Sequence, residues 1–380
     1  MEEEYSSLYK TEHSDKVGGI INFAVWSEAF QCANCGHENL FWETAIDHET
    51  KCILDEFPCE KCGSLITKKD GRIFESIYDD RLDKVVSVAK TRPALIVYTD
   101  SNGKRHERKA LPTDFEKIEA INRIPITYFV PTNELPAGDK TSDPINSQNI
   151  KYVHQFYTRR NLIVLSALLE KINTSKCPEK LRFVFTVMMS RATNRNRFSP
   201  RNYFYGGGRW NLTGLANTLY IPSLPIETSV LEILKNRIGT YRLIKDYLPT
   251  ANTNAVSLSS ACVSTINDNS IDYIFIDPPF GANIMYSELN YIYEAWFKVL
   301  TNTSTEAIVN KSQHKDLFDY QQLMNRSFKE FYRILKPGKW ITIEFSNTSA
   351  SVWNSIQNAL QGVGFVISNV AALDKKQGSF

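Results

Sequence analysis

Two pairs of cysteines constrain the fold of this 380-residue chain more than any other feature of its sequence. The motifs Cys32-Ala-Asn-Cys35 and Cys59-Glu-Lys-Cys62 each place two thiols on a tight turn, which a following glycine helps to close. Four thiolates suit a tetrahedral Zn²⁺ ion without an open coordination position, so the spacing predicts a structural zinc ribbon within residues 31–70. His37 and Cys52 are alternative ligands, and two pairs of buried thiols without metal are the alternative interpretation.

The cysteine count and the composition lead us to expect a globular, cytoplasmic protein. Seven cysteines are an odd number, and the acidic N-terminus MEEEYSSLYK lacks the apolar core of a secretory signal, so we expect a reducing compartment and no disulfide framework. No stretch approaches about 18 consecutive apolar residues, which predicts no membrane-spanning helix and no membrane partner. Hydrophobic residues make up 42% of the chain and its formal charge is only +2, which is typical of ordinary globular proteins.

The first 250 residues mix short apolar runs with amphipathic segments. The runs Ala94–Tyr98 and Ile126–Val130 predict strands between turn-rich stretches. Apolar residues at helical spacing predict helices over 157–172 and 228–247, and Pro249 stops the second run.

Beyond residue 250 the chain alternates strand-like and helix-like segments. Tyr273–Ile276 predicts a buried parallel strand, Trp340–Phe345 predicts the next strand, and Phe365–Ile367 predicts the start of a further strand. Amphipathic helices are expected at about 284–300, about 320–335 and through Val352, Ile356 and Leu360. Strands that alternate with helices indicate an α/β layer with parallel neighbouring strands.

The first of these strands runs directly into the turn Asp277-Pro278-Pro279-Phe280. Ligands of open α/β sheets bind outside the carboxyl ends of the strands, which is where Asp277 is expected. Two prolines hold a rigid turn and donate no N–H, so the turn offers the Asp277 carboxylate and the Pro278 carbonyl as acceptors, with Phe280 as a flat apolar face. This set suits a planar group that bears an exocyclic NH₂. The alternative is a plain strand-to-helix turn.

Positive charge is concentrated between residues 180 and 226, where seven basic residues occur without any Asp or Glu. Aromatic residues interleave with the arginines of this stretch. Arginines bind phosphates and aromatic rings stack on extruded bases, so the stretch predicts contacts to double-stranded DNA. The alternative is a solvated loop whose aromatic residues pack beneath it. The predicted nucleic-acid contacts are Arg191, Arg195, Arg197, Arg201 and Arg209.

The Asp277–Phe280 turn at a strand end resembles the catalytic motif of S-adenosylmethionine-dependent amino methyltransferases, which act on adenine N6 or cytosine N4 in DNA. The longer run Asn269–Asn290 resembles a branch of bacterial DNA methylases that carry a zinc ribbon inserted into the methyltransferase domain. Further segments extend the resemblance over nearly the whole chain. These are Phe156–Asn161, Thr218–Ser223, Tyr332–Gly338 and Leu373–Phe380.

The resemblance implies an α/β fold: a partial Rossmann-like methyltransferase sheet with an inserted zinc ribbon and a mixed α+β insertion. It implies that Asp277 and the Pro278 carbonyl bind the target amino group, that Phe280 stacks on the base, and that the base leaves the duplex. The implied cofactors are S-adenosylmethionine and a structural Zn²⁺, in a restriction-modification or phage-defence setting. The implied segments are a lead-in (1–30), the ribbon (31–70), a β-rich insertion (71–150), a helical, basic DNA-contacting region (151–250) and an incomplete catalytic subdomain (251–380).

The sequence departs from the family pattern at the cofactor loop. Neither the glycine-rich turn nor the acidic residue that holds the ribose is found, so the cofactor-binding residues are unknown. We expect the middle and late part of a larger enzyme, with a second polypeptide as a possible supplier of that loop. Gly206–Gly208, the only glycine cluster, is expected to be a hinge. Cys262 stands where related sequences often have an acidic residue near the end of the preceding strand.

Two further functions stay open at this stage. An RNA amino methyltransferase would use a similar turn, because related Asp/Asn-Pro-Pro turns occur there. A non-catalytic zinc-ribbon module that binds nucleic acid or a partner subunit would explain the missing cofactor loop.

Overall fold

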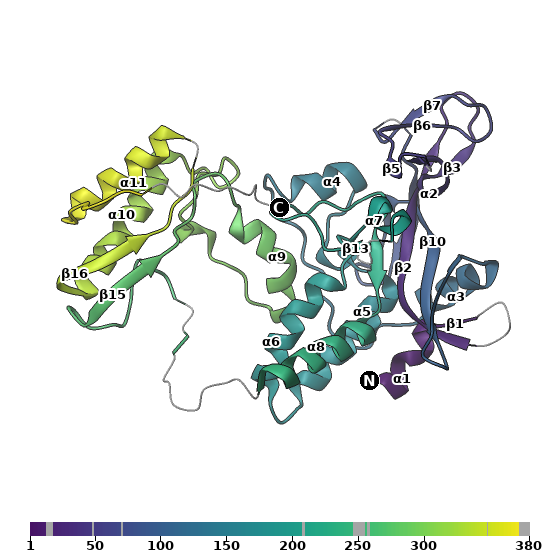
Figure 1. The fold of residues 1–380 in the computed structure, drawn as a ribbon, viewed down its shortest axis with the longest axis horizontal. Helices are drawn as coiled ribbons and strands as arrows, with labels where there is room; N and C mark the ends of the chain where they lie inside the picture. The colour runs from purple at the N-terminus through teal and green to yellow at the C-terminus, as the bar shows by residue number, and fades with distance from the viewer. Residues whose placement is uncertain are drawn as a thin grey trace. The chain divides into compact units, whose positions relative to one another are not determined.

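The computed structural model describes residues 1–12, 18–47, 49–69, 71–206, 210–245, 255–256, 259–347 and 349–371. The chain divides into two compact units. Unit 1 comprises Met1–Thr250 with Leu289–Leu300, and unit 2 comprises Ala251–Glu288 with Thr301–Phe380. Helix α9 (Tyr286–Phe297) begins in unit 2 and continues into unit 1 (Figure 1).

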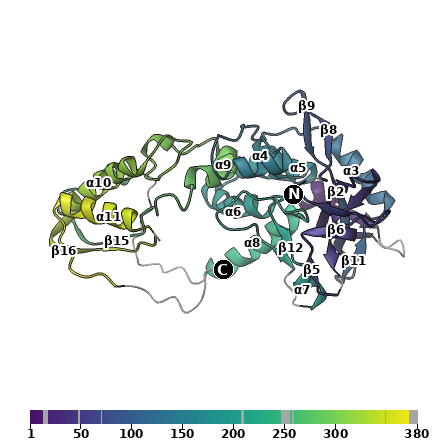
Figure 2. The same cartoon turned by 90° about the horizontal axis from the view of Figure 1, so that it is seen from above.

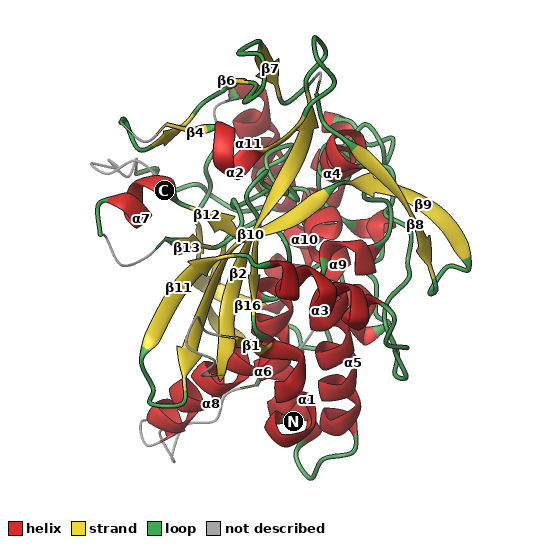
Figure 3. Ribbon diagram, turned by 90° about the vertical axis from the view of Figure 1, so that its right-hand side faces the viewer, coloured by secondary structure: helices red, strands yellow, loops and turns green. Residues whose placement is uncertain are grey.

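Unit 1 is built around an antiparallel sheet whose central strand is β2 (Gly18–Gln31). β2 pairs with β1, β3, β10 and β14. Figure 3 shows β10 beside β2, and β10 pairs in turn with β11. The bounds of these strands are β1 (Lys10–Glu12), β3 (Glu38–Leu40), β10 (Thr91–Asp100), β11 (Arg105–Lys109) and β14 (Ile226–Thr228). Two register shifts interrupt the β10–β2 ladder. Such irregularities increase the local twist, so the sheet is curled.

The two faces of this sheet bury two separate cores. Ile21 and Ile96 lie on the face that packs on the helices of unit 1. Val25 and Leu95 belong to a second cluster, which includes the cysteine-bearing segment and Phe198. Because both faces are covered, β2 and β10 carry apolar residues at successive positions instead of alternating them with polar ones.

Helix α5 (Arg159–Asn173) is the most enclosed element of unit 1, since every residue from Arg160 to Leu169 is buried. The Thr158 side chain caps it by accepting the backbone N–H of Asn161. The other helices of the unit are α1 (Glu2–Tyr5), α2 (Phe41–Thr44), α3 (Pro112–Asn122), α4 (Ser142–Gln148), α6 (Pro178–Arg191), α7 (Pro200–Phe204) and α8 (Val230–Lys245).

Short two-stranded ladders complete unit 1. The longest is the hairpin β8 (Phe74–Asp79) with β9 (Lys84–Ala89), which Figure 2 shows as an arm. The others pair β4 (Ile46–Asp47) with β5 (Cys52–Ile53), β6 (Glu56–Pro58) with β7 (Leu65–Thr67), and β12 (Arg197–Phe198) with β13 (Asn211–Leu212).

Unit 2 is a small α/β layer. Strands β15 (Ile271–Ile276) and β16 (Leu335–Ile343) pair in parallel, and α10 (Leu317–Ile334) packs with α11 (Ala350–Val363) (Figure 1). Ile274 and Ile341 belong to the apolar side of this sheet. The opposite side exposes aromatic rings, among them Phe275 (57% exposed) and Trp340 (63%).

The structure confirms most elements expected from periodicity and corrects three. Helices α5, α8, α9, α10 and α11 and strands β10, β15 and β16 lie where they are expected, and β15 and β16 are parallel. The burial expected of β15 is found on one face only, since Tyr273 and Phe275 are exposed. No strand forms at Ile126–Val130 or at Phe365–Ile367, because neither run meets a partner strand. Cys262 lies in a turn and not on a strand. Among the described residues, every helix is too short or too polar to cross a lipid bilayer.

Candidate functional site

The four cysteines of the two pairs converge on one point in unit 1. Their sulfur atoms all lie within 4.8 Å of one another, and the closest pairs are Cys32–Cys62 at 3.5 Å and Cys35–Cys59 at 3.6 Å. A tetrahedral Zn²⁺ with Zn–S bonds of about 2.3 Å needs sulfur–sulfur edges of about 3.8 Å. The cluster can therefore hold a metal ion, and four thiols at this spacing are consistent with zinc.

Local backbone geometry places the sulfurs. The backbone N–H of Gly36 donates to Cys32 O at 2.8 Å, and that of Gly63 donates to Cys59 O at 2.9 Å. Both glycines have φ near +70°, which disfavours any residue with a Cβ. These two turns are the reason that each pair is followed by glycine.

One side of the cysteine cluster is shielded from solvent. Cys32 and Cys59 are each only 2% exposed and belong to a core with Phe30, Phe41 and Phe57. The rings of Phe41 and Phe57 meet edge to face at 5.3 Å. The cysteine cluster and the core beneath it therefore form one packed body.

The outer side of the cluster meets solvent at Cys62. The hydroxyl of Ser64 and then its backbone N–H lower the pKa of Cys62 to about 5, which favours the thiolate that a metal needs. Cys52 is exposed and lies outside the cluster, and the His37 ring lies 3.9 Å from the Glu60 carboxylate. Neither alternative ligand joins the four cysteines.

In unit 2 the Asp277–Phe280 turn leaves the carboxyl end of β15. Because β15 and β16 are parallel, the residues that follow both strands meet at the same edge of the sheet. The ladder continues to Ile276, whose carbonyl accepts the N–H of Glu344 at 2.9 Å. Asn347, three residues further on, therefore lies beside the turn.

Two side chains donate hydrogen bonds to the backbone carbonyls at the end of the turn. The buried Tyr320 hydroxyl donates to Pro279 O at 2.6 Å, and Asn347 Nδ2 donates to Phe280 O at 2.8 Å. Asn347 is itself oriented, because its Oδ1 accepts the N–H of Ser349 at 2.7 Å. These contacts set the path of the turn from outside, since its prolines supply no N–H of their own.

Two acceptors of the turn are left without partners among the described residues: the Asp277 carboxylate and the Pro278 carbonyl. Asp277 is exposed, Pro278 is buried and Phe280 is half-buried, with its ring edge-to-face on Phe345 at 5.5 Å. Two unpaired acceptors thus stand beside a partly open aromatic ring. This arrangement can accept two N–H bonds from one planar group.

Tyr286, at the start of α9, adds a phenol to this edge of unit 2. Burial raises the pKa of Tyr286, and the carboxylates of Asp277 and Glu306 raise it further, so the hydroxyl stays protonated as a donor. Sequence reasoning missed Tyr286, Tyr320 and Asn347. The position of Asn347 just after a parallel strand is a signal that could have found it, whereas Tyr320 has no local signal.

The structure separates the predicted DNA-contacting arginines. Arg195 is engaged within unit 1, since Nη1 donates to Tyr293 Oη and Nη2 donates to Thr218 O at 2.5 Å. Arg191 and Arg197 are half-buried, Arg201 is exposed, and Arg209 lies outside the described residues. Only part of the set therefore has a guanidinium available to phosphate.

Most of the interleaved aromatic residues pack beneath this stretch. Phe198, Tyr203 and Trp210 meet one another with ring centroids 5.0–5.6 Å apart, and they contribute to the core that holds the cysteines. Tyr205 is 65% exposed. Most of these rings therefore pack beneath the loop, as the alternative to DNA binding expects, and are not available to stack on a base. The hinge expected at Gly206–Gly208 and the Leu373–Phe380 segment lie wholly or largely outside the described residues.

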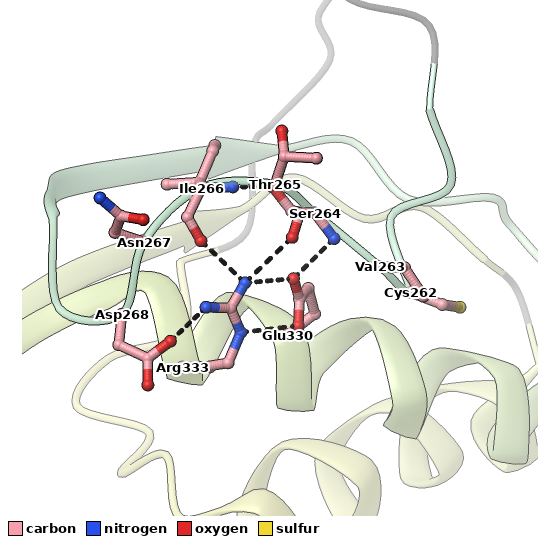
Figure 4. Close-up of a pocket in the computed structure, with 9 residues that line it drawn as sticks. All are labelled: Cys262, Val263, Ser264, Thr265, Ile266, Asn267, Asp268, Glu330 and Arg333. Atoms are coloured by element: carbon pink, nitrogen blue, oxygen red, sulfur yellow. Dashed lines mark hydrogen bonds and ion pairs between the residues drawn. The ribbon is translucent and has the colours of Figure 1, made fainter.

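A cavity of about 630 Å³ lies along the loop Cys262–Asp268, as Figure 4 shows. Arg333 clamps this loop: its guanidinium donates to Asp268, to Glu330 and to the carbonyls of Ser264 and Ile266. These contacts engage Nε, Nη2 and one N–H of Nη1, so most of the guanidinium is committed to the loop. The loop leads into the amino end of β15, whereas ligands bind at the carboxyl ends of such strands. We assign it a structural role.

A second cavity, of about 740 Å³, lies in unit 1 between the β8–β9 hairpin and the residues around α5. Its arginines are neutralised: Arg92 pairs with Glu75, Arg159 with Asp80, and Arg160 with Glu227. The Asp79 carboxylate accepts a hydrogen bond from His154 Nε2 at 2.7 Å. The cavity therefore has polar walls, and the six carboxylates of its lining outnumber the four arginines.

Comparison of the chain with family models, with curated proteins and with solved structures returns no match.

Proposed function

We propose that this chain is the base-binding part of an S-adenosylmethionine-dependent methyltransferase that acts on an exocyclic amino group in double-stranded DNA, adenine N6 or cytosine N4. The observation that carries the proposal is the division of acceptors in the Asp277–Phe280 turn. Tyr320 and Asn347 occupy the last two carbonyls, which leaves the Asp277 carboxylate and the Pro278 carbonyl for a ligand.

The chemistry of an aromatic amine explains why such a pair of acceptors is useful. Its nitrogen lone pair is conjugated with the ring and is a poor nucleophile. Hydrogen bonds from the NH₂ group to Asp277 and Pro278 would hold both hydrogens, and stacking on Phe280 would fix the plane of the ring. The lone pair would then point in one direction, toward an incoming electrophile. This chain's part in the reaction is to bind and orient that amino group.

The described residues do not fit the methyl donor. Among the described residues, no glycine-rich strand–turn follows β15 or β16. We therefore propose a second polypeptide that supplies the cofactor loop. The exposed aromatic side of the β15–β16 sheet supports this, since parallel sheets are normally covered on both faces. The cysteine cluster is proposed to hold a structural Zn²⁺.

Single-stranded homopolymers test the base site on the chain as it exists, without a methyl donor. Adenine and cytosine carry an exocyclic NH₂ and thymine does not, so fluorescence anisotropy should show tighter binding of oligo-dA or oligo-dC than of oligo-dT. Asp277→Ala should abolish this preference. Asp272→Ala is the matched control, because Asp272 lies on the same strand and pairs with Lys336 at 2.9 Å. Equal binding of all three oligomers by the unaltered chain would sink the proposal.

The missing cofactor loop favours one other function, a zinc-ribbon module that binds nucleic acid without catalysis. Methyl transfer from labelled S-adenosylmethionine to DNA and RNA separates the two. The chain alone should transfer nothing, and the chain purified with its natural partner should methylate DNA in an Asp277-dependent manner. Transfer to RNA in place of DNA would identify an RNA amino methyltransferase. No transfer by any complex would leave the non-catalytic module.

A further inference from the structure

Arginines that lie over aromatic rings follow a pattern in this protein, and Arg105 departs from it. Four arginines of the described chain have a guanidinium over a ring, and three of these also form an ion pair with a carboxylate. The three are Arg72, Arg108 and Arg160. The fourth, Arg105 on β11, is exposed, and its guanidinium makes no hydrogen bond or ion pair with any described residue.

Two packed rings form a platform beneath Arg105. Its guanidinium carbon lies 5.1 Å from the ring centroid of Phe23 and 5.9 Å from that of Trp210. These two rings meet edge to face at 4.7 Å, and Trp210 packs in turn on Tyr203 at 5.0 Å. All three rings pack in the second core, which fixes the platform. Attraction to a ring uses the charge of a guanidinium and not its N–H groups, so Arg105 is held in place with its donors available.

The carboxylates on either side of Arg105 along the chain are committed to other groups. Glu107, two residues further along β11, accepts a hydrogen bond from the Tyr203 hydroxyl at 2.9 Å. Asp100, at the end of β10, accepts one from His106 Nε2 at 2.8 Å and two more from backbone N–H groups. The positive charge of Arg105 therefore has no counter-charge within ion-pair distance in the described part of the chain.

Helix α7 adds a second free cation to this surface. The hydrogen bond between Tyr203 and Glu107 joins α7 to β11. α7 exposes Arg201, whose guanidinium likewise has no partner among the described residues. The exposed ring of Tyr205 lies one helical turn further on, since its backbone N–H donates to Arg201 O at 3.0 Å. Two cations without counter-charges and an exposed ring thus lie on neighbouring elements.

We infer that Arg105 and Arg201 bind phosphates in the backbone of double-stranded DNA. A phosphate diester supplies the missing negative charge and accepts paired hydrogen bonds from a guanidinium fork. Charged residues on an edge strand such as β11 also guard against aggregation, but that role needs only solvated charges and no ring platform. The inference rests on the proposed function only in naming double-stranded DNA as the source of the phosphate. Sequence reasoning found Arg201 in the acid-free stretch, whereas only the packing of Trp210 against Phe23 adds Arg105.

The test is a salt titration with a labelled DNA duplex of about 20 base pairs, followed by anisotropy between about 50 and 200 mM salt. Arg105→Gln and Arg201→Gln should each reduce the slope of log K against log salt by about 0.9, which corresponds to binding about eightfold weaker at about 0.1 M salt. Arg123→Gln is the matched control, since Arg123 is an exposed arginine of unit 1 with no described partner and no described ring beneath it. It should leave the slope unchanged.

Thermal unfolding separates this surface from a structural role. Both arginines are exposed, so both variants should melt at the temperature of the unaltered chain. An Arg105→Gln variant that melts lower and keeps the original slope would assign Arg105 a structural role and overturn the inference. An equal reduction of the slope by Arg123→Gln would overturn it too, and preference for an RNA duplex of the same sequence would overturn the assignment to DNA. Base preference is measured separately with homopolymers and Asp277→Ala, so either proposal can fail alone.

Discussion

The contact between Tyr320 and the turn gives the sharpest test of how unit 2 builds its site. Tyr320 is fully buried on α10, and its ring packs in a core with Met324 and Phe328. Its hydroxyl donates to Pro279 O, and no other partner of that hydroxyl is found among the described residues. Tyr320→Phe keeps the ring and removes only this bond, so the effect can be assigned to the turn.

The expected cost follows from the environment of the bond. A neutral hydrogen bond contributes about 1 kcal/mol, and a polar group left buried without its partner costs about 1–3 kcal/mol. Pro279 is only half-buried, so water can reach its carbonyl in part, and we expect a loss of about 1–2 kcal/mol. With a urea dependence of about 1–3 kcal/mol per molar, the midpoint should fall by roughly 0.3–2 M.

The assay is a urea titration read by pulsed hydrogen exchange of peptides from unit 2, because the two units need not unfold together. Tyr332→Phe is the control: Tyr332 is on the same helix, is 49% exposed, and its hydroxyl has no partner among the described residues. The preference for oligo-dA or oligo-dC over oligo-dT should also weaken in Tyr320→Phe, by up to about 5–30-fold. Equal midpoints for the two variants would refute the reasoning.

Three further outcomes follow from other contacts. Cys59→Ser or a chelator should release one zinc per chain, measured by metal analysis. Either should also expose the core around Phe57, measured by hydrogen exchange. The control Cys52→Ser should retain the metal. Glu227→Gln leaves the buried Arg160 without its counter-charge, so the free energy of unfolding in urea should fall by about 3–5 kcal/mol, and Glu232→Gln should have little effect. Hydrogen bonding to Arg159 lowers the pKa of Asp80 to about 2. Burial alone would raise the pKa of Glu227, but the charge of Arg160 outweighs burial, so the pKa of Glu227 is lowered too. A carboxylate whose pKa is lower in the folded state stabilises the fold above its unfolded pKa, which is about 4 for Asp80 and Glu227. The melting temperature should therefore fall as the pH drops below about 4. A melting temperature that stays constant there would contradict both ion pairs.

Local patterns in the sequence predicted what depends on neighbouring residues. The cysteine spacing predicted a cluster because each pair needs only one tight turn, with glycine at a positive φ, to bring two sulfurs together. The apolar periodicity of α10 and α11 predicted helices because residues three and four apart share a face whatever lies opposite. The parallel pairing of β15 and β16 followed from the alternation of strands and helices.

Predictions failed where an element needed a distant partner. Ile126–Val130 has a strand-like composition but meets no strand, and its apolar ends at Ile126 and Val130 are buried against helices instead. Phe365 likewise packs edge-to-face on Tyr332 at 5.1 Å and not in a ladder. Strand composition states only that a segment fits a sheet, and the backbone partner comes from elsewhere in the chain.

The sequence by itself determined the two cysteine pairs and the acceptor-rich turn at Asp277, because each of these motifs lies within four consecutive residues. Only the tertiary structure decided which acceptors of the turn stay free, since Tyr320 and Asn347 reach it from 41 and 67 residues away. It also decided that Arg195 is engaged inside unit 1, with Tyr293 and Thr218. The physical reason is that charge and hydrogen-bonding capacity belong to a residue, whereas their satisfaction belongs to its neighbours in space.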